Sequence, residues 1–96
     1  MRFEWNETKA EMNLIKHGVS FHRACTVFRD PNILSVPDLL HSLDEERWVS
    51  LGVSETGATL VVIHTYRKWN GDEAVRLISA RKASAREQRQ YLERRI

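Results

Sequence analysis

Cysteine is almost absent from this chain: Cys25 is the only one among 96 residues. No internal disulfide can form, which fits a reducing cytoplasm. Long apolar runs are also missing, because the longest, residues 60–63, is far short of the ~18 residues of a membrane span. The first residues contain no apolar secretory core, so we expect a cytoplasmic protein that is not exported.

Patterns for metal and cofactor chemistry are missing as well. The four histidines lack the spacing of zinc ligands, and a single cysteine cannot build a thiolate site. The sequence has no calcium loop, no glycine loop that could hold a phosphate, and no serine or cysteine nucleophile motif. We therefore expect no metal and no cofactor, so any chemistry must come from ordinary side chains.

The length and composition indicate one ordinary globular domain over residues 1–96. Apolar residues make up 42% and charged residues 29% of the chain, which argues against disorder and against a coiled coil. Charge is distributed unevenly, since residues 1–75 hold 8 Lys/Arg and 11 Asp/Glu (8 − 11 = −3) and residues 76–96 hold 7 and 2 (7 − 2 = +5). The basic end suits an anionic partner such as nucleic acid, although a short Arg-rich terminal helix is more often a solvated surface.

Hydrophobic periodicity and turn residues predict an α+β fold. The expected elements are a strand over 2–5, helices over 7–17 and 20–28, strands over 33–36, 48–53, 59–66 and 73–80, and a helix over 85–94. The first two helices should form an N-terminal helix pair that packs on an antiparallel sheet of about four strands, and a C-terminal helix should follow the sheet.

The Asn70-Gly71 pair is the strongest local signal, because this dipeptide favours a two-residue hairpin turn. Such a turn pairs Thr65 with Arg76 and places Arg67 and Arg76 on one face of the hairpin. Two guanidinium groups in that arrangement need an anion between them. A phosphate is one possibility, and a neutralising carboxylate from Glu46 or Glu73 is the other.

Two histidines are candidates for proton transfer. His17 is expected in the last turn of the first helix, where the helix dipole favours a protonated imidazole and Lys16 adds another cation. A histidine in this position is more often a capping residue that only suits the dipole. His64 is expected in the middle of a strand, where a histidine is more often part of the core or the sheet surface than a catalyst.

Several segments resemble the BrnT toxin family. They are Phe3-Glu4-Trp5-Asn6, Lys9, Asn13, residues 16–21 (KHGVSF), Asp38, His41, Arg47, Gly52, residues 62–67 (VIHTYR), residues 76–83 (RLISARKA), Glu87 and Tyr91. The resemblance covers almost the whole chain. It departs in the hairpin. Family members usually have a tight turn directly after the arginine that matches Arg67, whereas this chain has residues 68–70 before the turn glycine.

The resemblance implies a RelE-like fold and a small bacterial ribonuclease. Such a toxin is encoded beside a BrnA-like antitoxin that binds and blocks it, carries a ribbon-helix-helix DNA-binding part, and represses the operon as a complex. A two-plus-two heterotetramer is the assembly that the family implies, with operator DNA bound through the antitoxin. No membrane partner is expected.

RNA cleavage without a metal needs a base, an acid and cations that neutralise the phosphorane-like charge. Arg67, Arg76 and Arg81 are the predicted charge-stabilising residues, although Arg81 shares the face of Arg76 only if the strand bends near Ala80. His17 or His64 is the predicted base or acid. The predicted RNA-binding residues are Lys16, Tyr66, Lys82 and Tyr91, of which the tyrosines could also act as the acid or as stacking platforms.

A second function class stays open. The protein could be a catalytically weak binding module that holds the antitoxin and acts with it as a DNA-binding autorepressor complex. The net negative charge of residues 1–75 would suit a basic antitoxin surface as well as the basic end suits RNA.

Overall fold

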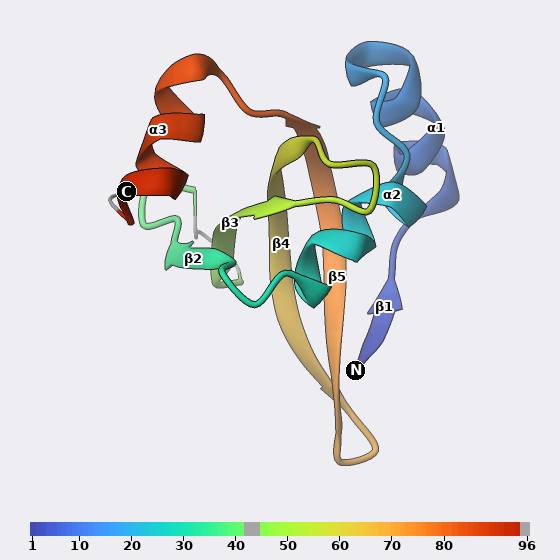
Figure 1. The fold of residues 1–96 in the computed structure, drawn as a ribbon. Helices are drawn as coiled ribbons and strands as arrows, with labels where there is room; N and C mark the ends of the chain where they lie inside the picture. Colours follow the sequence, from blue (N-terminus) through green and yellow to red (C-terminus); the bar gives the residue numbers. More distant parts are fainter. Residues whose placement is uncertain (42–44, 95–96) are drawn as a thin grey trace.

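The helices of this protein flank a single sheet (Figure 1). The computed structural model describes residues 1–41 and 45–94, except the side chain of Trp69. The elements are β1 (Arg2–Glu4), α1 (Glu7–His17), α2 (Phe21–Cys25), the 3₁₀ helix η1 (Thr26–Arg29), β2 (Leu34–Pro37), β3 (Arg47–Val53), β4 (Thr59–Trp69), β5 (Asp72–Lys82) and α3 (Ala85–Glu93). The α+β class predicted from sequence is therefore confirmed.

The sheet is mixed and has five strands in the order β1-β5-β4-β3-β2. The expectation of an antiparallel sheet of about four strands was wrong in this respect, because β1 pairs in parallel with β5. The physical reason is the edge that the β4–β5 hairpin would otherwise leave open. Pairing Arg2 with Ala74 and Glu4 with Arg76 satisfies backbone groups on that edge.

The first helix agrees with its sequence signals at both ends. The Asn6 side chain caps α1 by accepting a hydrogen bond from the Lys9 N–H at 3.0 Å, and Gly18 ends the helix with φ +69°. The second helix is shorter than predicted, because it is α-helical only to Cys25 and continues as η1. Thr26 donates its hydroxyl to the Arg23 carbonyl at 2.7 Å, and such a local bond competes with regular helix geometry.

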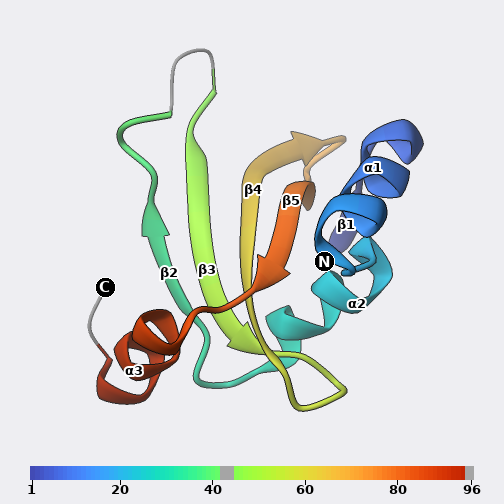
Figure 2. The same ribbon diagram turned by 90° about the horizontal axis from the view of Figure 1, so that it is seen from above.

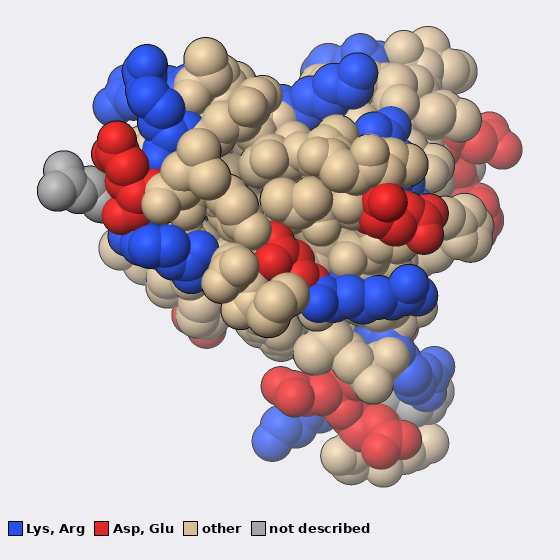
Figure 3. All heavy atoms as spheres, viewed as in Figure 1, with Lys and Arg blue, Asp and Glu red and all other residues tan. Residues whose placement is uncertain are grey.

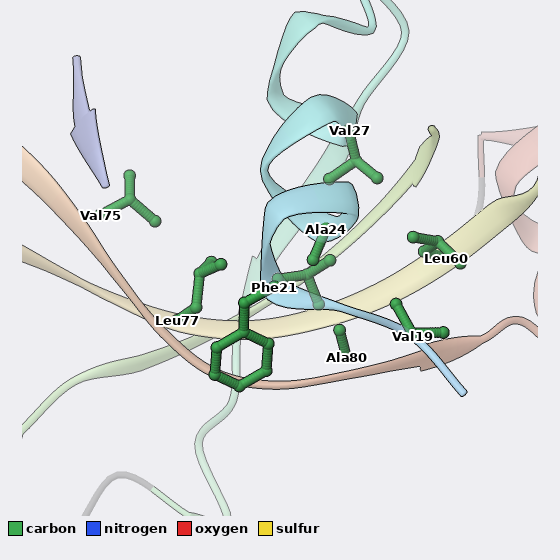
Figure 4. Close-up of a cluster of buried hydrophobic side chains, with 9 residues drawn as sticks. Val19, Phe21, Ala24, Val27, Leu60, Val75, Leu77 and Ala80 are labelled. Atoms are coloured by element: carbon green, nitrogen blue, oxygen red, sulfur yellow. The ribbon is translucent and has the colours of Figure 1, made fainter. Parts of the chain in front are cut away.

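Two apolar clusters lie on opposite faces of the sheet. The larger one gathers side chains of α2 and η1 against β4 and β5, as Figure 4 shows: Val19, Phe21, Ala24, Val27, Leu60, Val62, Val75, Leu77 and Ala80. The smaller one lies under α3 and consists of Leu51, Val61, Ala83 and Tyr91. Figure 2 shows α1 beside the β5 end of the sheet and α3 near β2 at the other end. The candidate site lies on the sheet, beside α1.

The β4–β5 hairpin projects beyond the rest of the molecule, at the bottom of Figure 1. Asn70 and Gly71 form its turn with φ values of +50° and +83°, as a type I′ turn requires. Trp69 therefore pairs with Asp72, and Thr65 pairs with Arg76. The register predicted from the Asn-Gly pair is confirmed.

The buried side chain of Asn13 joins α1 to the sheet. Its amide donates to the carbonyls of Val19 and Ala80 and accepts from the Ala80 N–H, at 2.9, 2.8 and 3.1 Å. We expect Asn13→Ala to lower the free energy of unfolding by about 2 kcal/mol, because three backbone groups lose their partner. Urea denaturation measures this loss. Leu14→Ala is the control on the same helix, and an equal loss in both variants contradicts the prediction.

Candidate functional site

Polar side chains from four strands form one row across the sheet. The strand register pairs Arg47 with Thr65, Thr65 with Arg76, and Arg76 with Glu4. Opposite residues of neighbouring strands point to the same face, so these four side chains lie on one side of the sheet. Arg67 is two residues beyond Thr65 on β4 and therefore shares that side. This row combines cations with a carboxylate and a hydroxyl.

Glu4 supplies the carboxylate that the paired arginines need. Its Oε1 lies 3.3 Å from Nη1 of Arg67 in an ion pair. The expected alternatives were Glu46 and Glu73, and β1 was overlooked because its parallel pairing brings Glu4 beside Arg76 from the opposite end of the sequence. Within the described part of the chain, Arg76 itself forms no ion pair. Arg76 is thus the guanidinium in this row that can take an anion without breaking an ion pair.

A bulge in β5 changes the face of Arg81. Thr65 pairs with Arg76 and Val61 pairs with Arg81, with a shift of register between Ile63 and His64. Because Thr65 and Val61 share a face, Arg76 and Arg81 share it too. The predicted bend therefore exists, but it lies at Ile78 and not at Ala80. The partners of the two arginines are four residues apart on β4, which separates the arginine Cα atoms by about 13 Å.

Arg81 is held by a carboxylate of α3. Two hydrogen bonds of 2.7 and 2.8 Å join its guanidinium to Glu87. The same carboxylate accepts from the Ser84 N–H at the start of α3. The hydrogen bonds from Arg81 lower the pKa of Glu87 to about 2, and Glu87 in turn raises the pKa of Arg81. Arg81 therefore fastens the start of α3 at a distance from Arg67 and Arg76.

A groove runs from this row along α1. It consists of three adjoining hollows of about 260, 40 and 530 Å³. Arg76 and Asn6 line both the first and the second hollow, and Lys9 and Ile78 line both the second and the third. Lys16 and His17 also line the third hollow. The structure thus places Arg67, Arg76, Lys16 and His17 along a row of hollows, each of which shares lining residues with the next.

His64 lies on the opposite face of the sheet. It is fully buried, its Nε2 lies 2.7 Å from the Ser50 hydroxyl, and the Phe28 ring packs edge-on against it at 4.9 Å. Among the described residues, no hydrogen-bond partner lies at its Nδ1. Burial lowers the pKa of His64 to about 4. The structure therefore does not bring His64 together with the groove.

The predicted RNA-binding residues outside the groove are scattered. Tyr66 lies on the face of His64, with their ring centroids 5.1 Å apart. Tyr91 is 8% exposed, donates its hydroxyl to Asp30, and burial raises its pKa to about 12. Lys82 is exposed at the end of β5 and pairs with Leu60. None of these three residues lines the groove hollows.

The side of the molecule that carries α2 presents charges of both signs. Lys and Arg alternate there with Asp and Glu (Figure 3).

Among the described residues, no three His, Cys, Asp or Glu side chains gather closely enough to hold a metal ion. Burial raises the pKa of the Cys25 thiol to about 11, which keeps it protonated. None of the described helices has the length and apolarity needed to cross a membrane.

Glu4 and Asn6 are among the groove residues that sequence reasoning missed. Both precede α1, and the parallel β1–β5 pairing brings them beside Arg76. The alternation of polar and apolar residues in Phe3-Glu4-Trp5 signals a strand, but it does not say which strand it pairs with. The same alternation could have placed His64 on the correct face. Its two neighbours in β4 point to the face that carries the arginines, so His64 points to the other face.

Together, the fold and the groove define a small α+β protein suited to an anionic substrate, and the fold has a solved counterpart. The crystal structure of the Brucella abortus ribonuclease toxin BrnT matches 88% of this chain and 97% of its own, with a TM-score of 0.65 and 23% sequence identity. No curated protein sequence matches this chain.

Comparison of the sequence with models of protein families identifies the family. Residues 5–87 match the family model described as "Ribonuclease toxin, BrnT, of type II toxin-antitoxin system". The chain belongs to the BrnT family, a family of ribonuclease toxins that have an antitoxin as their partner. The matched residues include the whole groove except Glu4.

Proposed function

We propose that this protein is an endoribonuclease toxin that cleaves RNA in the groove between α1 and β5 without a metal ion. The observation that carries the proposal is the position of Arg76, which adjoins Arg67 on the sheet and shares the second hollow with Lys9. Arg67 lines the first hollow, Lys9 lines the second and Arg76 lines both. Cations in these positions favour the charge that develops on a phosphate as a phosphodiester is cleaved. The family of ribonuclease toxins supports the same substrate.

The reaction that fits these residues is attack by a ribose 2′-hydroxyl on the neighbouring phosphorus. The 2′-oxygen forms a bond to phosphorus, its proton passes to a base, the bond to the 5′-oxygen breaks, and that oxygen takes up a proton. His17 is our candidate for proton transfer, because it lies in the groove and His64 does not. The products are a 2′,3′-cyclic phosphate and a 5′-hydroxyl.

The decisive experiment is cleavage of labelled RNA by the purified protein in EDTA, beside DNA of the same sequence. We expect RNA to be cut and DNA to stay intact, because DNA has no 2′-hydroxyl. Mass spectrometry of the fragments should find cyclic phosphate ends. Activity that disappears in EDTA and returns with added Mg²⁺ excludes the metal-independent reaction.

The Glu4–Arg67 ion pair predicts a gain of function in RNA binding. Glu4→Gln removes the carboxylate that competes with a phosphate for Arg67, so RNA affinity should rise about threefold at low salt. The dependence of log K on log salt should steepen by about 0.7, the value for one more neutralised phosphate of a single strand. Glu11→Gln makes the same change of charge on the exposed surface of α1. An equal gain from Glu11→Gln would assign the effect to net charge alone.

We also propose that a BrnA-like ribbon-helix-helix antitoxin neutralises the toxin in a two-plus-two assembly, which binds operator DNA through the antitoxin. The support is the type II toxin–antitoxin family. The alternative function, a catalytically weak module within that repressor complex, is favoured by one observation: Arg67 and Arg81 are already paired with carboxylates. Expression of the toxin alone separates the two, because only the nuclease should arrest growth.

A further inference from the structure

The third hollow of the groove is apolar, unlike the two that surround Arg76. Its walls come from Met12 and Ile15 of α1 and from Ile78 at the β5 bulge. Met12 is 63% and Ile15 is 85% exposed, so these apolar side chains lie open to solvent beside a hollow of about 530 Å³. Burying exposed apolar surface is favourable, so this surface is suited to an apolar ligand.

Charge around the hollow selects the kind of ligand. Lys9, Lys16 and His17 are part of its lining, and no Asp or Glu is. This contrasts with the net charge of −3 that residues 1–75 carry as a whole. A ligand for this hollow should therefore have an apolar body attached to an anionic group. A nucleotide has this composition, with a flat base for the apolar walls and a phosphate for the lysines.

The position of the hollow agrees with this ligand. Lys9 and Ile78 line both the apolar hollow and the one that Arg76 lines, so the two adjoin. Ile78 is two residues after Arg76, about 7 Å along the strand. A phosphate bound at Arg76 and Lys9 would thus have its own nucleoside within reach of Met12.

We propose that the hollow between Met12 and Ile78 is a nucleobase subsite, which binds the base of the nucleotide whose 2′-hydroxyl attacks the phosphate at Arg76. This inference rests on the proposed ribonuclease function and adds a specificity-determining element to it. The base packs between Met12 and Ile78, and the hydroxyl of Ser79, which also lines the hollow, can hydrogen-bond to a polar group of the base. Asn13 does not read the base, because its amide is committed to backbone bonds.

The test compares binding of two uncleavable strands by fluorescence anisotropy. One is a short 2′-O-methyl RNA, and the other is an abasic phosphate backbone of equal length. We expect Met12→Ala to weaken binding of the RNA about tenfold, because alanine buries less apolar surface against the base, and to leave binding of the abasic strand unchanged. Leu14→Ala is the matched control, because Leu14 is also half-exposed on α1 but does not line the hollow. Arg76→Ala should weaken both strands.

Each other outcome overturns the subsite. If Met12→Ala weakens both strands equally, or neither, the hollow does not hold a base. If Met12→Ala affects only the binding of an acidic amphipathic peptide of the antitoxin type, the hollow is a protein-docking surface. Because binding is measured without cleavage, a protein that binds the RNA in a base-dependent way but cuts nothing would refute the proposed nuclease and retain the subsite.

Discussion

Replacing Arg76 by alanine should lower the rate of RNA cleavage at least about 100-fold, the usual cost of one lost charge-stabilising donor. Arg76 lies between the first two hollows of the groove and forms no ion pair with another described residue. Its guanidinium is therefore available for the phosphate throughout the reaction. Single-turnover cleavage of labelled RNA measures the rate of the chemical step separately from binding.

The matched control is Arg86→Ala, which removes an exposed arginine of α3 that lines no part of the groove. This variant should cleave RNA at the wild-type rate. Arg76→Lys keeps the charge but loses the planar fork, so it should recover only part of the rate. Wild-type cleavage by a folded Arg76→Ala variant would remove Arg76 from the site and favour the binding-module function.

The order of elements and the hairpin register could be predicted because their signals are local. Asn6 and Gly18 delimit α1, and Asn70-Gly71 sets the pairing of the last two strands. The face shared by Arg67 and Arg76 follows from that turn by alternation alone. These features depend on residues close to one another in the sequence, which is where turn and capping chemistry acts.

Features that depend on distant residues could not be predicted in this way. Glu4 reaches Arg67 only because β1 pairs with β5, more than 60 residues later in the chain. The face of Arg81 depends on a bulge at Ile78 that no local pattern announces. Tyr91 was expected to contact RNA, but the packing of α3 directs its hydroxyl to Asp30. Tertiary contacts decide all three.

The burial of His64 predicts a loss of stability in mild acid. The pKa of His64 falls from its ordinary 6.5 to about 4 in the folded protein, chiefly because burial disfavours the charged imidazole. Between these two values the unfolded chain binds a proton that the folded chain does not. The contribution of the neutral imidazole to stability is therefore complete above pH 6.5 and decreases as the pH falls. Below pH 4 this contribution is gone, and the free energy of unfolding is lower by about 3 kcal/mol.

Urea denaturation at pH 7 and pH 4.5 measures this contribution. His64→Gln cannot titrate but can still hydrogen-bond the Ser50 hydroxyl, so its unfolding free energy should change with pH by about 2 kcal/mol less than that of the wild type. His22→Gln is the control, because His22 is an exposed imidazole on α2. A pH dependence of His64→Gln as steep as that of the wild type would show that His64 takes up its proton in the folded state. That result would reopen a catalytic role for His64, because a buried imidazole that ionises near neutral pH is what an acid or base in this reaction requires.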